Sequence, residues 1–379
     1  MTARITIPPQ VQALLRQLNA AGFSAYAVGG CVRDSLLGCA PQDWDICTSA
    51  APEQTEACFA ADRTILTGAR YGTVTVVRGG VPYEITTFRA ESGYADSRHP
   101  DRVDFLRELA PDLARRDFTV NAMAADAAGA VTDLFGGQDD LRRGVIRCVG
   151  RSAERFSEDA LRMLRACRFA AQLGFAIEPE TWAALLRCAP LCKQLSRERI
   201  TEEVTKTIRS PSPQWAAAMI RCGLLTSCCL TGSHDLSWLS MLPPTAEARW
   251  AGFGLLVPEL DFSAFRLPGK LVKLCRMARE HWPAPEERLG WKRLLAAEGE
   301  EAARLLATLV QTDAVDEIIA SGDCVSLKTL AVSGHDFPDL RGPALGQLLN
   351  RLLEHVLQAP ADNNRETLLE LSKKFESPS

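Results

Sequence analysis

Two aspartates separated by a single residue, Asp43 and Asp45, are the first candidates for chemistry in this sequence. Side chains two positions apart on a strand face the same side, so the two carboxylates converge while Trp44 points away. Hard oxygen donors on one face suit Mg²⁺, with phosphate oxygens and water completing its octahedron. Two such ions activate an attacking hydroxyl and neutralise a leaving pyrophosphate. Taken alone, the pattern is more often an exposed acidic strand edge or the Asp-x-Asp of another enzyme such as a sugar transferase than a metal site of this kind.

A glycine pair lies just upstream, in the run Gly29-Gly30-Cys31-Val32-Arg33-Asp34. This run links a predicted strand at residues 25–28 to a predicted helix start at residues 32–37. Glycines at such a turn let a phosphate approach the backbone and the helix N-terminus, and Arg33 adds a positive charge nearby. A glycine pair between strand and helix is often purely structural, but its position shortly before Asp43 strengthens the metal-site interpretation.

A charged triplet, Arg115-Arg116-Asp117, enters the apolar run Phe118-Thr119-Val120-Asn121-Ala122. The functional interpretation puts Arg116 on a triphosphate and Asp117 near a ribose. The structural alternative is a solvated helix start that Asp117 caps. Further along, the sequence DLFGGQDDL at residues 133–141 contains a glycine turn. We interpret this turn as architecture that closes the first domain.

A predicted helix carries charged residues at every third position, namely Asp159, Arg162, Arg165 and Arg168. These residues share one broad helix face, and the apolar Met163, Leu164 and Cys167 lie opposite. A ladder of ion pairs on a solvated surface has the same spacing. The helix taken alone therefore favours the ladder.

The elements that must position these residues change type along the chain. The first 145 residues predict α/β structure, with further strands at residues 44–47, 73–78 and 83–88 and a hairpin turn at Gly79-Gly80. After about residue 148, apolar residues recur at spacings of three and four, which indicates helices. Segments rich in proline and glycine at residues 211–213, 242–245 and 282–285 predict joints between helical units.

Composition indicates an ordinary soluble chain of 379 residues with 46% hydrophobic and 24% charged residues. No apolar stretch is long enough to span a membrane, and we expect no signal peptide. The thirteen cysteines are scattered and form no CxxC pair, which favours reduced thiols and a cytoplasmic location. Net charge is −4, yet residues 142–168 hold eight arginines against three acids. A local basic stretch of this kind suits a protein that binds phosphate in one groove.

Taken in order, these motifs resemble the class II tRNA nucleotidyltransferases, which comprise the CCA-adding enzymes and bacterial poly(A) polymerases. The matching strings are GGCVRD, DWD, RRDFTVNAMA, DLFGGQDDL and EDALRMLRACRFAAQLGF, within about residues 22–208. The resemblance implies an α+β fold: a small mixed-sheet nucleotidyltransferase head like that of DNA polymerase β, followed by an all-helical neck, body and tail. The expected boundaries are 1–145, 146–208, 209–275 and 276–379, with tRNA binding in the tail.

The resemblance also assigns roles to single residues. Asp43 and Asp45 would be catalytic and bind Mg²⁺, with Glu84 as a candidate for a further acidic group. The nucleotide would be bound by Gly30, Arg33 and Arg116 and by the neck residues Asp159, Arg162, Arg165 and Arg168. Asp159 and Arg162 would read the base. This assignment has a physical basis, because cytosine and adenine each present an amine beside a ring-nitrogen acceptor, which a carboxylate and a guanidinium complement.

Within the family, residues 91–100 resemble the loop that CCA-adding and A-adding enzymes carry, and the segment around Gly334-His335-Asp336 is similar to the tail of the Bacillus-type CCA-adding enzymes. The leading expectation is CCA addition to tRNA from CTP and ATP. Poly(A) polymerase, an A-adding enzyme of a split pathway, a catalytically silent RNA-binding protein and a sugar transferase are the alternatives. The sequence leaves the oligomeric state open, with a homodimer as one alternative.

Overall fold

A seven-stranded mixed sheet forms the core of the first 145 residues, which we call the head. The computed structural model describes residues 3–92 and 102–376. Strand order is β3-β4-β5-β2-β1-β8-β9, and β2 and β5 are the parallel neighbours among antiparallel ones. The strands are β1 Ala25–Val28, β2 Ile46–Thr48, β3 Arg63–Ile65, β4 Thr73–Arg78, β5 Val81–Thr87, β8 Met123–Ala125 and β9 Val131–Asp133. The predicted mixed sheet is confirmed.

The hairpin of β4 and β5 shows how the local sequence produces the sheet. Val74 and Val76 alternate with half-buried threonines, so one face of β4 enters the core. Gly79 and Gly80 both have positive φ, at 60° and 81°, which suits a two-residue turn between antiparallel strands. The predicted hairpin is therefore confirmed, with β5 beginning at Val81 rather than Tyr83.

Helices and a second small sheet complete the head. Strands β6 (Arg89–Ser92) and β7 (Arg102–Phe105) pair antiparallel. The first helix, which we did not predict, begins at Pro9 and buries Val11, Leu14 and Leu18 along one side. The helices are α1 Pro9–Ala20, α2 Gly30–Leu36, α3 Pro52–Cys58, α4 Leu109–Ala114 and α5 Gly137–Arg143, with the 3₁₀ turns η1 Ala69–Tyr71 and η2 Thr119–Asn121.

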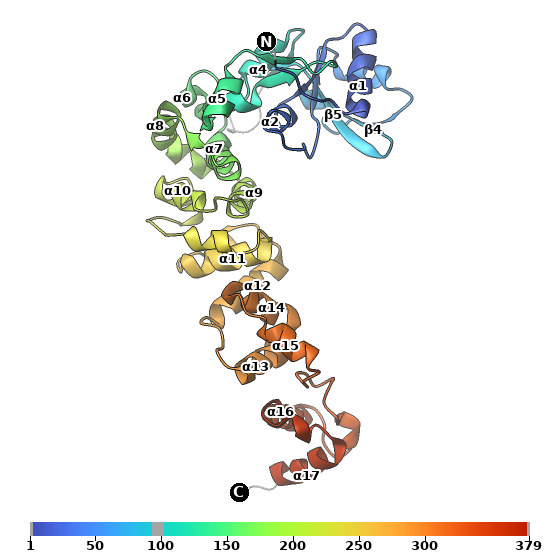
Figure 1. Ribbon diagram of the computed structural model, residues 1–379, viewed down its shortest axis with the longest axis vertical. Coiled ribbons are helices and arrows are strands. Elements are labelled where there is room, and N and C mark those ends of the chain that lie inside the picture. The colour runs from blue at the N-terminus through green and yellow to red at the C-terminus, as the bar shows by residue number, and fades with distance from the viewer. Residues whose placement is uncertain (1–2, 93–101, 377–379) are drawn as a thin grey trace. The chain divides into compact units, whose positions relative to one another are not determined.

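Residues 146–208, which we call the neck, are mainly helical, as predicted (Figure 1). One short parallel pair, β10 (Val145–Ile146) with β11 (Ala176–Ile177), lies among the helices and was not predicted. The apolar pattern at Leu161, Leu164 and Phe169 is buried, which confirms that helix. The helices up to residue 235 are α6 Ser152–Glu158, α7 Leu161–Leu173, α8 Pro179–Cys188, α9 Arg197–Ile208 and α10 Trp215–Arg221, with η3 Ala189–Gln194 and η4 Thr226–Cys228.

The remaining residues form only helices and turns among those that the structure describes (Figure 1). Trp250, Phe253 and Phe262 are fully buried in one part, and Leu348 and Leu352 belong to the apolar core of the last part. The elements are η5 Ser237–Met241, α11 Ala246–Leu256, η6 Phe262–Ala264, α12 Gly269–Glu280, α13 Arg288–Glu298, α14 Glu300–Val310, α15 Ala314–Ala320, η7 Gly334–Asp336, α16 Pro343–Gln358, η8 Pro360–Asp362 and α17 Arg365–Glu376. The three predicted joints all fall between helices.

Two compact units divide the chain, Met1–Asp235 and Leu236–Ser379. Head and neck belong to the first unit, so their mutual contacts are part of one body. The four-part division at residues 145, 208 and 275 stays a prediction. All thirteen cysteines are free, as expected from their scattered positions.

Candidate active site

Asp43 and Asp45 lie in the segment that leads into β2, not on the strand itself. We predicted a strand over residues 44–47, whereas β2 begins one residue after Asp45. The reason is the neighbouring strand, since β1 ends at Val28, whose amide donates to the Asp45 carbonyl at 3.0 Å. Strand β1 therefore offers no ladder partner to residues before Asp45. The same-side rule for strands does not by itself orient Asp43.

Glu84 is a third acidic side chain, and its charge raises the pKa of Asp45. Enclosure by protein atoms raises the pKa of Asp45 to about 6, and the charges of Asp43 and Glu84 shift the pKa in the same direction. Strands β2 and β5 pair in parallel with Ile46 opposite Ile85, so Glu84 lies beside Asp45 in register. Crowded carboxylates that hold a proton this tightly are stabilised in their ionised form by a cation. The oxygen donors present fit a hard divalent ion.

Arg116 reaches the same site from the end of α4. Its Nη2 donates to Oδ2 of the fully buried Asp112 at 3.2 Å, and its charge lowers the pKa of Asp45. Gly29 leaves room for it, because the backbone there has φ of 83° and a Cβ would lie 3.2 Å from Arg116 Nη1. The buried Nε of Arg116 has no hydrogen-bond partner among the described residues. A buried N–H without an acceptor is unfavourable, so this guanidinium suits an anionic ligand.

Arg33 connects the glycine turn to the charged triplet. Its Nη1 donates to Asn121 Oδ1 at 2.6 Å and its Nε donates to Asp34 Oδ1 at 2.8 Å. Asn121 in turn donates from Nδ2 to Asp117 Oδ1 at 3.1 Å. Two motifs that are far apart in sequence therefore meet at one place. A Cβ at Gly30 would make only an ordinary contact, 3.6 Å from Arg33, so the predicted role of Gly30 stays a prediction.

Asp117 is buried and its carboxylate binds a neck residue. Arg165 donates from Nε to Asp117 Oδ2 at 2.8 Å, while Oδ1 accepts from the Phe118 amide and from Asn121. Burial alone would raise the pKa of Asp117, but the charge of Arg165 and these hydrogen bonds lower it to about 2. Asp117 thus makes an ion pair between head and neck. Its predicted place near a ribose stays a prediction.

Asp159 and Arg162, the predicted base readers, are each held by another side chain. Asp159 Oδ2 accepts from Arg199 Nη2 at 2.9 Å, and Oδ1 accepts from the Leu161 amide at 3.0 Å. Arg162 Nη1 donates to Glu158 Oε2 at 2.6 Å. Arg162 is only 8% exposed, so the interpretation of this helix as a solvated ladder of ion pairs is wrong.

The other two arginines of α7 surround a buried aromatic ring. The guanidinium of Arg168 lies 4.0 Å from the centroid of the Phe169 ring, and those of Arg165 and Arg33 lie at 5.3 Å and 5.2 Å. Arg168 also donates to Glu203 Oε2 at 2.6 Å. The ring brings one arginine of the head together with two of the neck, which stabilises all three through cation–π contacts.

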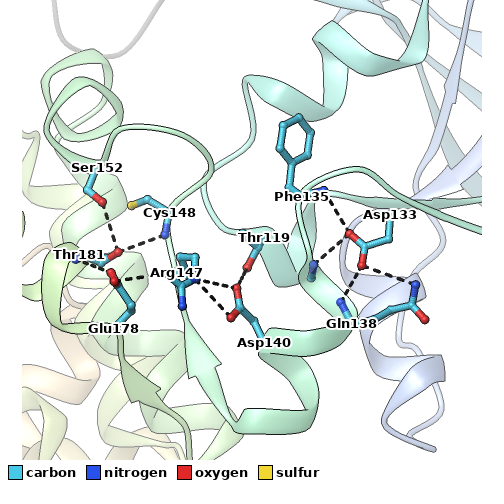
Figure 2. A network of polar contacts seen from close by, with 11 residues as sticks. Thr119, Asp133, Phe135, Gln138, Asp140, Arg147, Cys148, Ser152, Glu178 and Thr181 are labelled. Carbon is cyan, nitrogen blue, oxygen red and sulfur yellow. Dashed lines mark hydrogen bonds and ion pairs between the residues drawn. The ribbon is translucent and has the colours of Figure 1, made fainter.

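A polar network joins the head to the neck (Figure 2). Thr119 Oγ1 donates to Asp140 Oδ2 at 2.7 Å, and Arg147 lies between Asp140 at 3.1 Å and Glu178 at 3.3 Å. Beside it, Asp133 accepts from the amide of Gln138 at the start of α5 (Figure 2). The glycine turn at residues 133–141 contributes structure here, as we interpreted it from the sequence.

Several residues of the site were not singled out from the sequence. They share one feature, which is that each binds the side chain of a predicted site residue. Asn121 had a usable signal, since it lies in the quoted string RRDFTVNAMA. These residues are Asp112, Asn121, Glu158, Arg199 and Glu203. The predicted loop at residues 91–100 falls largely on 93–101, outside the described residues.

Sequence comparison decides which family this site belongs to. A CCA-adding enzyme from Enterococcus faecalis is 37% identical over 388 residues, which covers 96% of this chain and 95% of that protein. The chain belongs to the CCA-adding enzymes. A CCA-adding enzyme from Geobacillus kaustophilus is likewise 37% identical over 95% of this chain and 96% of its own. Family profiles match as well, one described as the poly A polymerase head domain at residues 25–147 and one as the probable RNA and SrmB-binding site of polymerase A at residues 174–228.

Solved structures agree with this assignment. The CCA-adding enzyme of Bacillus stearothermophilus in complex with CTP has a TM-score of 0.85 and 32% identity, covering 98% of this chain and 99% of that one. The Thermotoga maritima CCA-adding enzyme complexed with tRNA has a TM-score of 0.71 at 20% identity, covering 98% and 97% of the two chains, and supports the fold alone. The predicted α+β fold and family are therefore confirmed.

Nucleotidyltransferases of this family work with a divalent metal ion. Within residues 3–92 and 102–376, no cluster of three or more His, Cys, Asp or Glu side chains is arranged to hold a metal. The assignment of Asp43, Asp45 and Glu84 to a metal therefore stays a prediction. None of the described helices combines the length and apolar character needed to cross a membrane.

Proposed function

We infer that this CCA-adding enzyme takes tRNA as substrate and adds C, C and A to its 3′ end, from CTP twice and then from ATP. The observation that carries this inference is the identity of 37% to a CCA-adding enzyme over 96% of the chain. In each step the 3′-hydroxyl oxygen forms a bond to the α-phosphorus of the incoming nucleotide. The bond from that phosphorus to the bridging oxygen breaks, the hydroxyl proton leaves, and pyrophosphate is released.

Asp43 and Asp45 are the residues that we propose to hold Mg²⁺. The support is their oxygen donors, the charge of Glu84 nearby and the raised pKa of Asp45. When bound, two such ions activate the attacking hydroxyl and neutralise the charge that develops on the pyrophosphate. Asp43 and Asp45 are both exposed residues, so a metal ion would have access to their carboxylates from solvent.

Arg116 and Arg33 are proposed to bind the triphosphate, with Gly30 close to the nucleotide. The support for Arg116 is its buried and unpartnered Nε. Arg33 is fixed by Asn121 and Asp34, so its guanidinium is held before a ligand arrives. Preorganised charge of this kind is worth more at a protein site than the same charge on a mobile side chain. Arg165 and Arg168 would support the nucleotide site from the neck.

Asp159 and Arg162 are proposed to select the base without a nucleic-acid template. The amine of cytosine or adenine would donate to Asp159, and Arg162 would donate to the neighbouring ring nitrogen. Uracil and guanine present a carbonyl beside an N–H, so both protein groups would face partners of their own kind. A good bidentate contact to a base discriminates by about 1–3 kcal/mol in DNA readout. Unpaired polar groups in a desolvated pocket add to the penalty.

A stepwise incorporation assay tests this function. A tRNA lacking its last three nucleotides is supplied with CTP alone and then with ATP, and the products are sized. We expect two added residues with CTP and a third after ATP. Addition of many A residues, or no addition of C, would instead identify a poly(A) polymerase or an A-adding enzyme.

An alanine substitution tests the proposed metal ligands. Asp43→Ala should lower incorporation at least about a hundredfold, because a donor to the transition-state charge is lost, while tRNA binding stays nearly intact. Asp139→Ala is a control, since Asp139 is an exposed aspartate of the same domain paired with Arg142. Unchanged incorporation by Asp43→Ala would remove the proposed site.

A further inference from the structure

Phe169 of the neck lies within cation–π distance of an arginine of the head. The centroid of its ring is 5.2 Å from the guanidinium carbon of Arg33, which lies on helix α2. The ring is only 5% exposed and meets Phe118 of the head edge to face, with 5.8 Å between centroids and 81° between planes. Phe169 therefore contacts two head residues, although it belongs to helix α7 of the neck.

The polar partners of the Arg33 guanidinium belong to the head. Asp34 accepts from Nε at 2.8 Å and is the next residue on the same helix, so it moves together with Arg33. Asn121 accepts from Nη1 at 2.6 Å and lies on η2. Neither contact fixes the guanidinium relative to the neck. The ring of Phe169 does so, because it lies on the helix that also carries Arg162, one of the proposed base readers.

Stacking on a ring suits a guanidinium that must bind a ligand. A stacked guanidinium keeps its in-plane N–H donors for other partners, and cation–π attraction is stronger where water is excluded. The side chain of Arg33 is only 11% exposed. Arg165 and Arg168 also contact the ring, and like Arg33 each has a carboxylate partner, at 2.6 Å in both cases. The three positive charges are thus balanced by acids, and what the ring contributes is their position.

We propose that Phe169 is a positioning residue for the triphosphate of the incoming nucleotide. Its ring holds the guanidinium of Arg33 at a fixed place relative to α7, so the triphosphate site of the head and the base site of the neck keep the separation that one nucleotide spans. This inference rests on the proposed role of Arg33 in triphosphate binding. Phe169 acts through Arg33 and does not touch the nucleotide. Loss of the ring therefore weakens the binding of a nucleoside triphosphate whichever base it carries.

Inorganic tripolyphosphate is the probe, because it carries the phosphates without a base or a ribose. Its inhibition constant against CTP is measured at fixed Mg²⁺, together with kcat and KM for CTP and for ATP on tRNAs that await each nucleotide. In Phe169→Leu we expect the inhibition constant and both KM values to rise about tenfold, with kcat nearly unchanged. The ratio of kcat/KM for CTP to that for UTP should stay the same, since the ring does not act on the base.

Variants with and without an aromatic ring separate positioning from a general loss of packing. Phe169→Tyr keeps the aromatic face and should keep the inhibition constant of the wild type, whereas Phe169→Met fills the space without a ring and should resemble Phe169→Leu. Phe156→Leu is the matched control, since Phe156 is a fully buried phenylalanine of α6, which packs against α7. It should lower the melting temperature and leave the inhibition constant unchanged. An inhibition constant that follows the melting temperature and not the presence of the ring overturns the proposal.

A double-mutant cycle tests whether the ring acts through Arg33. In an Arg33→Met background, Phe169→Leu should no longer change the inhibition constant, and an equal change in both backgrounds overturns the proposal. An Arg33→Met enzyme that binds tripolyphosphate like the wild type would overturn the proposed triphosphate role and this inference together. Weaker binding in Arg33→Met beside unchanged binding in Phe169→Leu overturns this inference alone.

Discussion

At the residue scale, the site consists of charged groups that are each fixed by an oppositely charged or polar neighbour. Arg33 is held by Asn121, Arg116 by Asp112, and Arg165 by Asp117. Long guanidinium side chains lose conformational freedom when they bind a ligand. Because these side chains are already fixed in the free protein, the entropy is lost during folding and not again when the ligand binds. The one buried donor left without a partner, among the described residues of this group, is Arg116 Nε, which suits a phosphate oxygen.

The Asp117–Arg165 pair predicts a dependence of stability on pH. The pKa of Asp117 is lowered from 3.8 to about 2. The folded state therefore binds the proton of the Asp117 carboxyl more weakly than the unfolded state does. The stability that the ionised carboxylate contributes is complete above about pH 4 and is lost as the pH falls towards 2. The full contribution is about 2 kcal/mol.

Urea unfolding between pH 5 and pH 3 measures this effect. The free energy of unfolding of the wild type should fall more steeply with pH than that of Asp117→Asn, which cannot titrate at this position. Asp139→Asn, an exposed pair partner of Arg142, is the control and should keep the wild-type slope. Parallel slopes for wild type and Asp117→Asn would contradict the assignment of this pKa.

At the element scale, the short turn η2 connects site residues that lie on several other elements. The 3₁₀ turn η2 holds Asn121, which binds Arg33, and it also holds Thr119, which binds Asp140 beside Arg147 (Figure 2). Helix α5 packs directly against this turn. The position of η2 therefore depends on how closely the start of α5 can approach it, and Gly137 sets that distance.

Gly137→Ala tests the packing of α5 on η2. A Cβ at Gly137 would lie 2.3 Å from the carbonyl oxygen of Thr119, so backbone atoms must shift. We expect a loss of about 3 kcal/mol in the free energy of unfolding and weaker CTP binding, since Asn121 moves with η2. Gly346→Ala in α16 is the control, because open space surrounds it, and it should be neutral or slightly stabilising. If Gly137→Ala lowered the free energy of unfolding by no more than a surface substitution does, the backbone at Thr119 would not be rigid.

At the scale of the whole molecule, the chain consists of two units, and every predicted site residue belongs to Met1–Asp235. Residues 236–379 have their own apolar cores around Trp250 and around Leu352. Units with separate cores unfold as separate cooperative transitions when their interface is small or polar. A ligand stabilises the unit that binds it by mass action.

Calorimetry of the full chain tests this division. CTP with Mg²⁺ at about a hundred times its Kd should stabilise one unit by roughly 2.7 kcal/mol, and raise one melting transition by several degrees. The second transition should not move. The Asp45→Ala variant is the control, in which the shift should shrink or vanish. A single transition that shifts as a whole would show that the two units unfold together.

The sequence by itself determined the family, the order of the motifs and the type of most elements. The glycine hairpin at β4 and β5, the helix with arginines at every third position and the joints between helical units all depend on residues that are near one another in the chain. Local patterns encode such features directly, because turn conformation and apolar periodicity are properties of short segments. The position of β2 was less predictable, since its start depends on where β1 ends.

Only the tertiary structure decided which side chains hold the site residues. The contact of Arg33 with Asn121 joins positions 88 residues apart, and those of Asp117 with Arg165 and of Asp159 with Arg199 join positions 48 and 40 residues apart. Nothing in a local pattern specifies the register between such distant segments. That register follows from the packing of α2 against η2 and of α7 against α9, where a buried charge must find its partner or destabilise the fold.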